Sequence, residues 1–411
     1  MSERLPIAPA LAARPVTKKE NGATRRQVIQ RLVAAGFAGP VIASILAADG
    51  LARQATPAAP ASPAATPDPA SALAAIGKDS RLIGYGTTTF GTPLELIDGL
   101  TVPNELFFIR SNGPVSVDIA PDTWRLAVTG LVDSPLDLGL ADLQAMPRRT
   151  FTAFLECSGD SRGRFEPKAD GTQWGNTAVG NAEWSGVPLT TILDQAGVRE
   201  GAVDVVSQGG DFPEMRRGLP LAMARDPNTM LVWEMNGVPL PAPHGGPVRL
   251  FVPGWGAIAS TKWLVGLDVI DHSFTGTFNT ESYVIIDEAE RVLRPVTTMP
   301  VKSVITAPGE GVTLPAGAQT VAGYAWSGFG GIARVEVSTD GGGTWSDAPI
   351  VLEAGRLSWV RFEFPWEAAP GDARLRSRAY DDRGLTQPDT VPWNAKGYQM
   401  NAVDEVAVTV G

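Results

Sequence analysis

The sequence is poor in the side chains that build most protein metal sites. Its 411 residues contain a single cysteine, Cys157, and two histidines, His244 and His272. One cysteine cannot close a disulfide within the chain. Alone, it cannot supply the thiolates of a cysteine-rich zinc site or of an iron–sulfur cluster. The sequence therefore excludes these classes of site.

Positive charge is also scarce. Lys and Arg number 34 against 44 Asp and Glu, which leaves a formal net charge of −10. No basic tract with interleaved aromatic residues offsets this balance, so a nucleic-acid partner is not expected. The hydrophobic share of 44% and the charged share of 19% are typical of globular proteins, and the length suits two or three domains.

A long, uninterrupted apolar run is missing as well. The apolar stretch 32–48 is short, rich in Gly and Ala, and broken by Pro40, which argues against a membrane span. It follows Arg25 and Arg26 in the segment Thr-Arg-Arg-Gln-Val, a twin-arginine pattern. We therefore predict that residues 1–53 form a Tat export signal, which places the protein in the periplasm or on the outer face of the cytoplasmic membrane. The sequence is compatible both with cleavage of this signal and with its retention as an anchor.

The rest of the chain divides into three parts by composition and periodicity. Residues 54–78 are rich in Ala and Pro and predict a flexible linker. Residues 79–294 mix helical and strand patterns without a regular βαβ repeat, which favours an α+β domain. Residues 295–411 contain short alternating segments separated by Gly- and Asp-containing turns, the pattern of an immunoglobulin-like β-sandwich.

Cys157 lies in an unusual setting. The apolar run 151–155 predicts a buried strand that ends just before a polar turn containing the cysteine, and Arg162 and Arg164 follow closely. A guanidinium group near a thiol stabilises the thiolate, which is the form that attacks electrophiles or binds metals. Considered alone, the segment is equally compatible with a buried structural cysteine, the commonest fate of an isolated one.

Two segments together indicate a family. Residues 156–162, Glu-Cys-Ser-Gly-Asp-Ser-Arg, resemble the E-C-[AS]-G-N-x-R segment of the sulfite oxidase family of molybdenum–pterin enzymes, with Asp160 in place of asparagine. Residues 244–263 begin His-Gly-Gly-Pro-Val-Arg and end Ser-Thr-Lys-Trp, which is similar to that family's H-G-x-P-[VL]-R … S-V-K-W pattern. Guanidinium groups, lysines and free backbone N–H groups bind phosphate, so these residue types suit a phosphate-bearing cofactor.

The resemblance extends over about residues 80–411 and implies a role for each matching residue. The implied metal ligand is Cys157. The implied cofactor-binding residues are Phe108, Ile109, Arg110, Ser111, Asn112, Asp211, His244, Arg249, Ser260, Thr261 and Lys262. The implied catalytic residues are Cys157, Arg110, Arg162, Tyr283 and Lys396. Asn112 and Lys396 stand where the family has histidine and arginine.

The resemblance also implies an activity. It points to a molybdenum–molybdopterin enzyme that oxidises sulfite, a small sulfur oxyanion, to sulfate by oxygen-atom transfer. It further implies a homodimer formed through the carboxy-terminal domain and an external electron acceptor such as a cytochrome c. Because the chain has two histidines and no separate domain to carry a bis-histidine haem, no haem is expected in it.

Two alternatives stay open at this point. One is a sulfane dehydrogenase-like enzyme, or another oxidoreductase of sulfur compounds or oxyanions within the same family. The other is a cofactor-free binding protein whose β-sandwich is the working part. Loss of Cys157 or Lys262 would have favoured this second alternative, but both residues are present.

The twin-arginine pattern leads to a first prediction. Changing Arg25 and Arg26 together to Lys should leave the protein in the cytoplasm, because Tat export depends on the arginine pair. Cell fractionation measures this, and the same change at Arg14 and Arg53, which lie outside the pattern, serves as the control. Normal export of the Arg25/Arg26 variant would show that the signal is misassigned.

Overall fold

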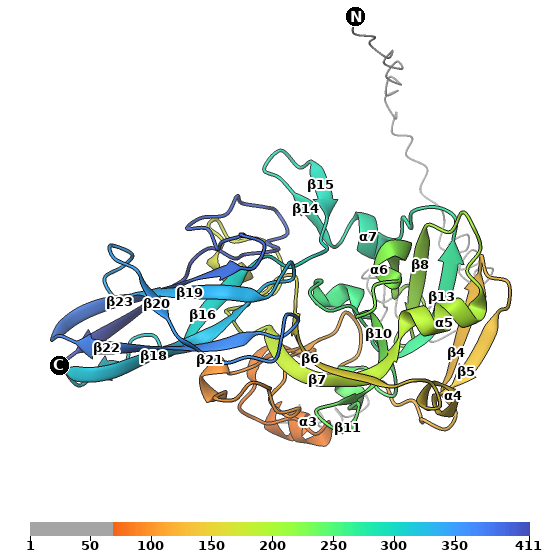
Figure 1. Ribbon diagram of the computed structural model, residues 1–411, viewed down its shortest axis with the longest axis horizontal. Helices are drawn as coiled ribbons and strands as arrows, with labels where there is room; N and C mark the ends of the chain where they lie inside the picture. The colour runs from red at the N-terminus through yellow and green to blue at the C-terminus, as the bar shows by residue number, and fades with distance from the viewer. Residues whose placement is uncertain (1–68) are drawn as a thin grey trace, which may run out of the picture. The chain divides into compact units, whose positions relative to one another are not determined.

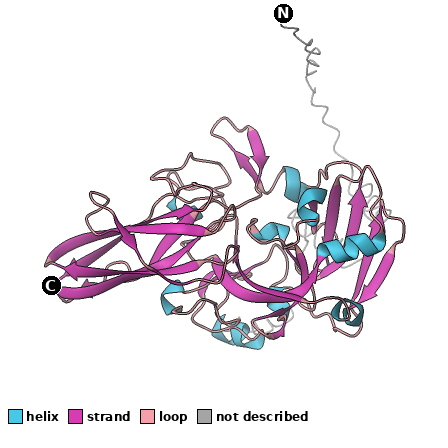
Figure 2. Cartoon of the chain, viewed as in Figure 1, coloured by secondary structure: helices cyan, strands magenta, loops and turns pink. Residues whose placement is uncertain are grey.

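The described part of the protein, residues 69–411 of a computed structural model, is built mainly from β-sheets joined by long loops, with a few short helices (Figures 1 and 2). The predictions for residues 1–53 and 54–68 lie outside it. The α-helices are α3 (Pro69–Ala75), α4 (Leu140–Gln144), α5 (Leu189–Ala196), α6 (Leu221–Ala224) and α7 (Thr277–Thr280). Short 3-10 helices span Leu94–Leu96, Arg162–Arg164, Ala242–His244 and Ala257–Ala259.

The first part of the fold contains two five-stranded sheets, a three-stranded sheet and a hairpin. One five-stranded sheet has the order β5 (Leu136–Gly139), β4 (Arg125–Gly130), β13 (Leu264–Ile270), β8 (Asp204–Gly209) and β9 (Arg216–Pro220). The other has the order β11 (Val238–Pro239), β10 (Met230–Met235), β7 (Val179–Pro188) and β6 (Arg149–Glu156), with β12 (Arg249–Phe251) also paired to β10. The small elements are β1 (Ile83–Gly86), β2 (Thr89–Gly91), β3 (Ile109–Arg110), β14 (Val284–Ile286) and β15 (Val292–Pro295). Strands β4 and β13 pair in parallel, whereas β6, β7 and β10 pair antiparallel, which confirms the α+β prediction.

Local sequence explains the elements that carry the site. Helix α5 buries Leu189, Ile192, Leu193 and Ala196, which share one face because helical positions three and four apart are neighbours. In β6 the outer half is exposed or half-buried, and the last four residues, which end at Glu156, are buried. The apolar run predicted there as a buried strand therefore carries the chain into the interior immediately before Cys157.

The second part is the predicted β-sandwich (Figure 2). Its four-stranded sheet has the order β16 (Lys302–Ala307), β18 (Gly317–Trp326), β22 (Val360–Ala368) and β21 (Ile350–Leu352). Its five-stranded sheet has the order β17 (Thr313–Leu314), β24 (Glu405–Val410), β23 (Gly371–Asp381), β19 (Ile332–Ser338) and β20 (Ser346–Ala348). Buried side chains of the two sheets, among them Val321 and Phe362 from one and Val335 and Leu375 from the other, form a single core.

The two parts share buried residues. Tyr324, Trp326 and Trp359 of the sandwich belong to the same hydrophobic cluster as Phe154 of β6. The indole N–H of Trp359 donates to the Leu100 carbonyl at 2.7 Å. Strand β15 also runs through the predicted domain boundary at 294/295. The sandwich is therefore packed against the first part of the fold through a common core.

The structure corrects the end of the predicted linker. Residues 69–75 form helix α3, Leu73 is buried, and Lys78 is 5% exposed. The prediction treated the Ala-rich composition as a sign of flexibility, yet alanine is the strongest helix former when an apolar face finds a partner. Residues 69–78 thus belong to the folded part.

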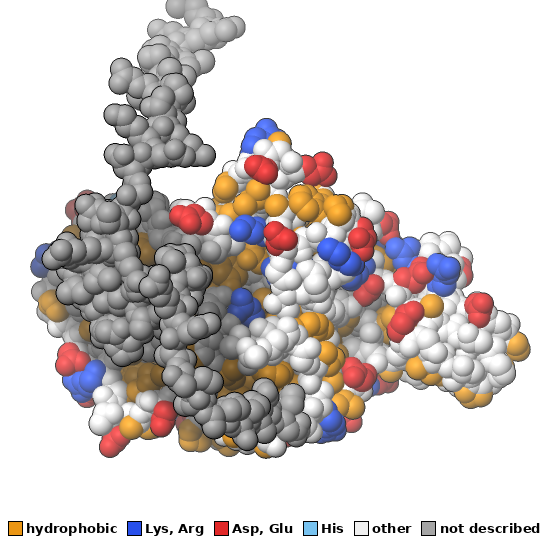
Figure 3. Space-filling view, turned by 180° about the vertical axis from the view of Figure 1, so that it is seen from behind, with side chains coloured by type: hydrophobic (Ala, Val, Ile, Leu, Met, Phe, Trp, Pro, Cys, Tyr) orange, Lys and Arg blue, Asp and Glu red, His pale blue; other side chains and the backbone are white. Residues whose placement is uncertain are grey.

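The surface is mixed in charge. On the face shown in Figure 3, acidic and basic side chains lie side by side over the sandwich and the β14–β15 hairpin. Val292 and Leu293 of that hairpin are 56% and 57% exposed. Within residues 69–411, no helix combines the length and the apolar character that a membrane crossing requires.

The shared core leads to a second prediction. Trp359→Ala should lower the free energy of unfolding by about 3–5 kcal/mol, because it removes a fully buried indole and its hydrogen bond. Val351→Ala, at an exposed position of the same sandwich, should change it by less than about 0.5 kcal/mol. Urea unfolding of both variants followed by tryptophan fluorescence measures the difference. Similar stabilities for the two would mean that the shared core contributes little.

Candidate active site

A cleft in the first part of the fold gathers most of the predicted site residues. It encloses about 710 Å³ of space, part of it open to solvent. The predicted residues that line it are Phe108, Ile109, Arg110, Ser111, Asn112, Cys157, Asp211, His244, Arg249, Ser260, Thr261, Lys262 and Tyr283. Segments from distant parts of the sequence meet here, so the cleft is a product of the fold and not of one local motif.

Cys157 enters the cleft at the end of β6. Its backbone N–H donates to the Ala178 carbonyl at 2.8 Å, and its carbonyl accepts from the Asp160 N–H at 2.9 Å. The residue is 8% exposed. These bonds hold the cysteine in a tight turn with its side chain on the cleft wall.

The structure bears on the protonation of Cys157. The sequence left two equal alternatives, a thiolate favoured by the nearby Arg162 and Arg164 and a buried structural cysteine. Burial raises the pKa of the Cys157 thiol above its ordinary value, and the charges of Arg110 and Arg162 only partly oppose this effect. Arg164 pairs with Asp404 at 3.1 Å. In the protein alone the thiol form is therefore favoured, and a bound metal cation would supply the charge needed for deprotonation.

The basic end of the cleft contains Arg249 and Lys262. Arg249 donates to the carbonyls of His244 and Ser260 at 2.9 and 2.8 Å, while Lys262 donates to the Ser111 hydroxyl at 2.9 Å. Burial lowers the pKa of Arg249 to about 9. Burial, reinforced by the charge of Arg249, lowers the pKa of Lys262 well below its ordinary value. Both shifts arise because these cations are held out of water with little negative charge nearby.

His244 lies beside a lysine that the motifs did not predict. The ammonium of Lys78 is 3.0 Å from His244 Nε2 and 2.7 Å from the Phe107 carbonyl, and it also contacts the Asn104 carbonyl. Burial, with the charge of Lys78 next, lowers the pKa of His244 well below its ordinary value. Nε2 of the neutral ring lies within hydrogen-bond distance of both the Lys78 side chain and, at 3.2 Å, the Asn104 carbonyl, so it accepts from the first or donates to the second according to the tautomer.

Arg110, Asn112 and Tyr283 form a polar group at the other side of the cleft. One guanidinium nitrogen of Arg110 donates to the Asn112 side-chain carbonyl at 2.9 Å. The Tyr283 hydroxyl is 3.3 Å from both the oxygen and the nitrogen of the Asn112 amide. Burial raises the pKa of Tyr283, so the phenol is protonated and can donate. Asn112, which replaces the family's histidine, thus connects the arginine to the tyrosine.

Arg162 and Lys396, two of the predicted catalytic residues, do not line the cleft. Arg162 donates to the backbone carbonyls of Lys396 and Thr172 at 2.8 and 3.2 Å. Its guanidinium lies 4.9 Å from the ring centre of Tyr398, and that ring stacks on Tyr283 at 5.4 Å. Lys396 is half-buried. In this structure Arg162 supports the aromatic wall behind the cleft.

Sequence reasoning missed Lys78 and Tyr398. Lys78 falls in the segment predicted as a linker, and Tyr398 lies two residues beyond the motif position of Lys396. No spacing rule identifies either residue. The position of Tyr398 could have been suspected from its closeness to Lys396, whereas Lys78 carried no local signal.

Comparisons with known proteins support the assignment of the cleft as a cofactor site. Residues 112–278 match the family model of the oxidoreductase molybdopterin binding domain, and residues 294–411 match that of the Mo-co oxidoreductase dimerisation domain. Both models describe domains of molybdopterin-dependent oxidoreductases, and the matches assign the chain to this class of protein.

Individual relatives identify the family. Mitochondrial sulfite oxidase of Rattus norvegicus is 35% identical over 347 residues, which cover 77% of this chain and 63% of that enzyme. Sulfite oxidase of Gallus gallus is 34% identical over 75% of this chain and 73% of its own length. The solved structure of the sulfane dehydrogenase SoxCD from Paracoccus pantotrophus superposes with a TM-score of 0.74 at 29% identity, over 91% of this chain and 97% of that one. The chain belongs to the sulfite oxidase family, and it spans less than two thirds of the length of the mitochondrial enzymes.

The residues of the cleft fit a molybdenum–pterin group. Arg249 Nε and Asp211 Oδ1 are buried and find no hydrogen-bond partner among the described residues. Burial raises the pKa of Asp211. An anionic phosphate would neutralise Arg249 and Lys262, pterin N–H groups would suit Asp211, and Cys157 offers a soft sulfur ligand for the metal. The family match and this fit set aside a cofactor-free binding protein.

Lys78 leads to a third prediction. Its pKa in the folded chain is about 7, lowered from 10.5 chiefly by burial, so the unfolded chain binds more protons between these values. The stability of the cofactor-free protein should therefore rise with pH across this window, and the rise should be smaller in Lys78→Met. Thermal unfolding of protein made in a host without the pterin pathway, at several pH values in this window, measures it. Lys168→Met, at an exposed lysine, is the control, and equal slopes for all three proteins would contradict the assignment.

Proposed function

We propose that the protein oxidises sulfite to sulfate with a molybdenum–molybdopterin cofactor. The observation that carries the proposal is the arrangement of one cleft, with the lone cysteine at its wall, buried unneutralised cations at one end and an Arg–Asn–Tyr group at the other. When bound, the molybdenum–pterin group supplies oxygen-atom transfer to sulfur and takes up two electrons. The protein residues bind and orient the cofactor and the substrate and neutralise their negative charge.

Each end of the cleft has a distinct task in this proposal. Arg249, Lys262 and the neutral His244 hold the phosphate and pterin, since two buried basic side chains suit an anionic group. On the opposite side, Arg110 binds the sulfite oxyanion. The Asn112 side-chain carbonyl and the Ser111 backbone carbonyl each accept a hydrogen bond from the Arg110 guanidinium, and its remaining N–H groups are left for the substrate.

Tyr283 supplies a neutral donor. Its protonated hydroxyl lies beside Asn112, where it donates to an oxygen of the substrate without adding charge. Arg162 and Lys396 act from behind this wall, with Arg162 adding positive potential at Cys157. Lys396 remains the proposed counterpart of the family's arginine and would reach the substrate by a change of rotamer.

A second candidate substrate is a sulfane sulfur compound. It is supported by the structural similarity to SoxCD, a sulfane dehydrogenase, over nearly the whole of both chains. The point-charge lysine at 396 also holds a compact oxyanion less rigidly than an arginine fork would. Comparison of kcat/KM for sulfite and thiosulfate with ferricyanide as acceptor separates these two substrate classes.

The assembly and location form part of the proposal. Similarity of residues 294–411 to a dimerisation domain supports a homodimer. The twin-arginine pattern supports export to the periplasm or the outer face of the cytoplasmic membrane. Electrons then pass to an external acceptor such as a cytochrome c, because this chain is proposed to carry no haem.

Replacement of the metal ligand tests the proposal. Cys157→Ser should keep the pterin but reduce sulfite turnover by about 100-fold or more, which corresponds to roughly 3 kcal/mol of barrier, because serine lacks the soft sulfur ligand. A sulfite–ferricyanide assay with molybdenum and pterin quantified per chain measures both effects. Ser346→Ala, at an exposed position of the sandwich, is the control. Turnover of Cys157→Ser within about threefold of wild type would contradict the role of Cys157.

A further inference from the structure

Two acidic residues flank Cys157 and point away from the cleft. Glu156 precedes the cysteine and Asp160 follows it by three positions, and neither lines the cleft. Their side chains are 3% and 0% exposed. Ionised carboxylates are costly to bury without a partner, so the fold needs a specific interaction at this point.

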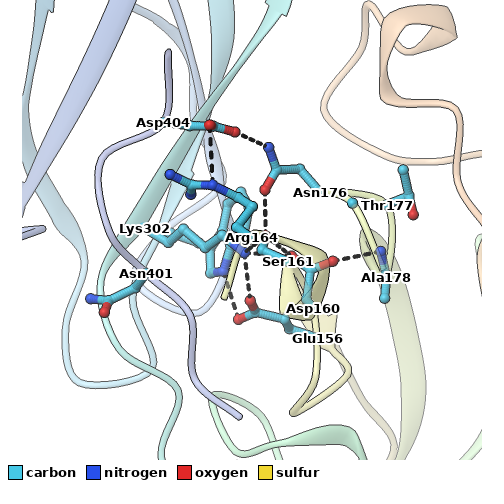
Figure 4. A network of polar contacts seen from close by, with 12 residues as sticks. Glu156, Asp160, Ser161, Arg164, Asn176, Thr177, Ala178, Lys302, Asn401 and Asp404 are labelled. Atoms are coloured by element: carbon cyan, nitrogen blue, oxygen red, sulfur yellow. Dashed lines mark hydrogen bonds and ion pairs between the residues drawn. The ribbon is translucent and has the colours of Figure 1, made fainter. Parts of the chain in front are cut away.

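A pair of neighbouring sandwich residues provides that interaction, and Figure 4 shows one of them, Lys302, beside the two acids. Lys302 of β16 and Trp326 of β18 lie directly opposite each other in the sheet. The Lys302 ammonium is 2.5 Å from Asp160 Oδ2, 2.7 Å from the Ser161 hydroxyl and 3.5 Å from Glu156 Oε1. The Trp326 indole N–H donates to Glu156 Oε2 at 2.8 Å. The two sides of the cysteine turn are therefore held by one cross-strand pair of the sandwich.

The same contacts fix the backbone of the turn. Asp160 Oδ1 accepts from the Ala178 N–H at 2.7 Å, and the Ala178 carbonyl accepts from the Cys157 N–H at 2.8 Å. Ser161 has a φ of 62°, a left-handed conformation that non-glycine residues adopt at a cost. Its hydroxyl donates to the Asn176 side chain while accepting from Lys302, so both interactions support this strained residue.

A second link from the sandwich reaches the turn through Asn176. The Asn176 amide donates to Asp404 Oδ2 at 2.6 Å, and Asp404 Oδ1 pairs with Arg164 at 3.1 Å (Figure 4). The carboxylate of Asp404 thus forms its ion pair with Arg164. Within residues 69–411, the ion pairs of Glu156 and Asp160 are both made with Lys302.

We propose that Lys302 is a positioning residue for Cys157. Its ammonium clamps the turn through Asp160 and Ser161 and so sets where the cysteine sulfur stands in the cleft. The sandwich thereby takes part in building the metal site. Asp160 occupies the place of the family's asparagine, and Lys302 supplies the charge that this acid requires. The inference rests on the proposed function, because it assumes that Cys157 ligates molybdenum.

The test compares three variants of the full chain purified from a host that makes molybdopterin. Lys302→Gln leaves two buried acids without their cation. Asp160→Asn restores the family's residue and keeps Lys302 with Glu156. The double variant removes one charge of each sign. Each is measured for molybdenum per chain, for the thiolate-to-metal charge-transfer absorption and for the midpoint of thermal unfolding.

A clamp predicts a specific pattern. Well below its own melting temperature, Lys302→Gln should hold less than about a third of the wild-type molybdenum or show a displaced charge-transfer band, because the sulfur is no longer fixed. The double variant should recover most of both signals, since the Asp160 carboxylate is no longer buried without a cation and Glu156 keeps the N–H of Trp326. Val335→Ala, in the sandwich core and remote from the turn, should melt earlier with a wild-type band and metal content.

Three results would overturn the inference. The first is a wild-type band and metal content in Lys302→Gln below its melting transition, and the second is a double variant no better than Lys302→Gln. If Lys302→Gln yields no folded protein, the double variant decides, and a folded double variant that lacks the wild-type band is the third. Wild-type protein without molybdenum would instead overturn the proposed function, and with it this inference.

Discussion

Positive charge kept out of water is the constraint on which the cleft depends. Burial lowers the pKa of Arg249 to about 9 and that of Lys262 well below its ordinary value, and the surrounding protein offers them few anions. Such an arrangement is unfavourable for the protein alone and favourable once an anionic group binds. The protein thus positions in advance the basic side chains that an anionic cofactor needs, and binding of such a group would stabilise the fold.

The cysteine wall follows a related rule. Burial favours the neutral thiol of Cys157, so a metal bound there would have to supply the charge that deprotonates it. The turn that carries this thiol is held from outside the cleft, by Lys302 and Trp326 of the sandwich. The cysteine turn therefore faces the cleft on one side and is held by the sandwich on the other. The supporting residues do not obstruct the cleft.

Sequence periodicity predicted those elements whose formation depends on neighbouring residues in the chain. The apolar run before Cys157, the face of helix α5 and the alternating strands of the sandwich each show their period in the sequence, and all three are present. Motif similarity also placed thirteen of the fifteen predicted site residues on one cleft. What escaped prediction depends on distant contacts. Lys78 contacts His244, which lies 166 positions further along the chain. The pKa of Cys157 depends on burial by residues from several distant segments, so no single segment of the sequence predicts it.

The shared core has a consequence for the order in which the protein can be made. Trp359 bonds to Leu100 across 259 positions, and Tyr324 bonds to Ile97 across 227. A ribosome that has synthesised the whole cofactor-binding region has therefore not yet supplied the side chains that close its interior. The nascent chain must keep apolar surface exposed until its last strands emerge, and contacts of such separation form slowly. Completion of the shared core therefore waits for the strands of the sandwich.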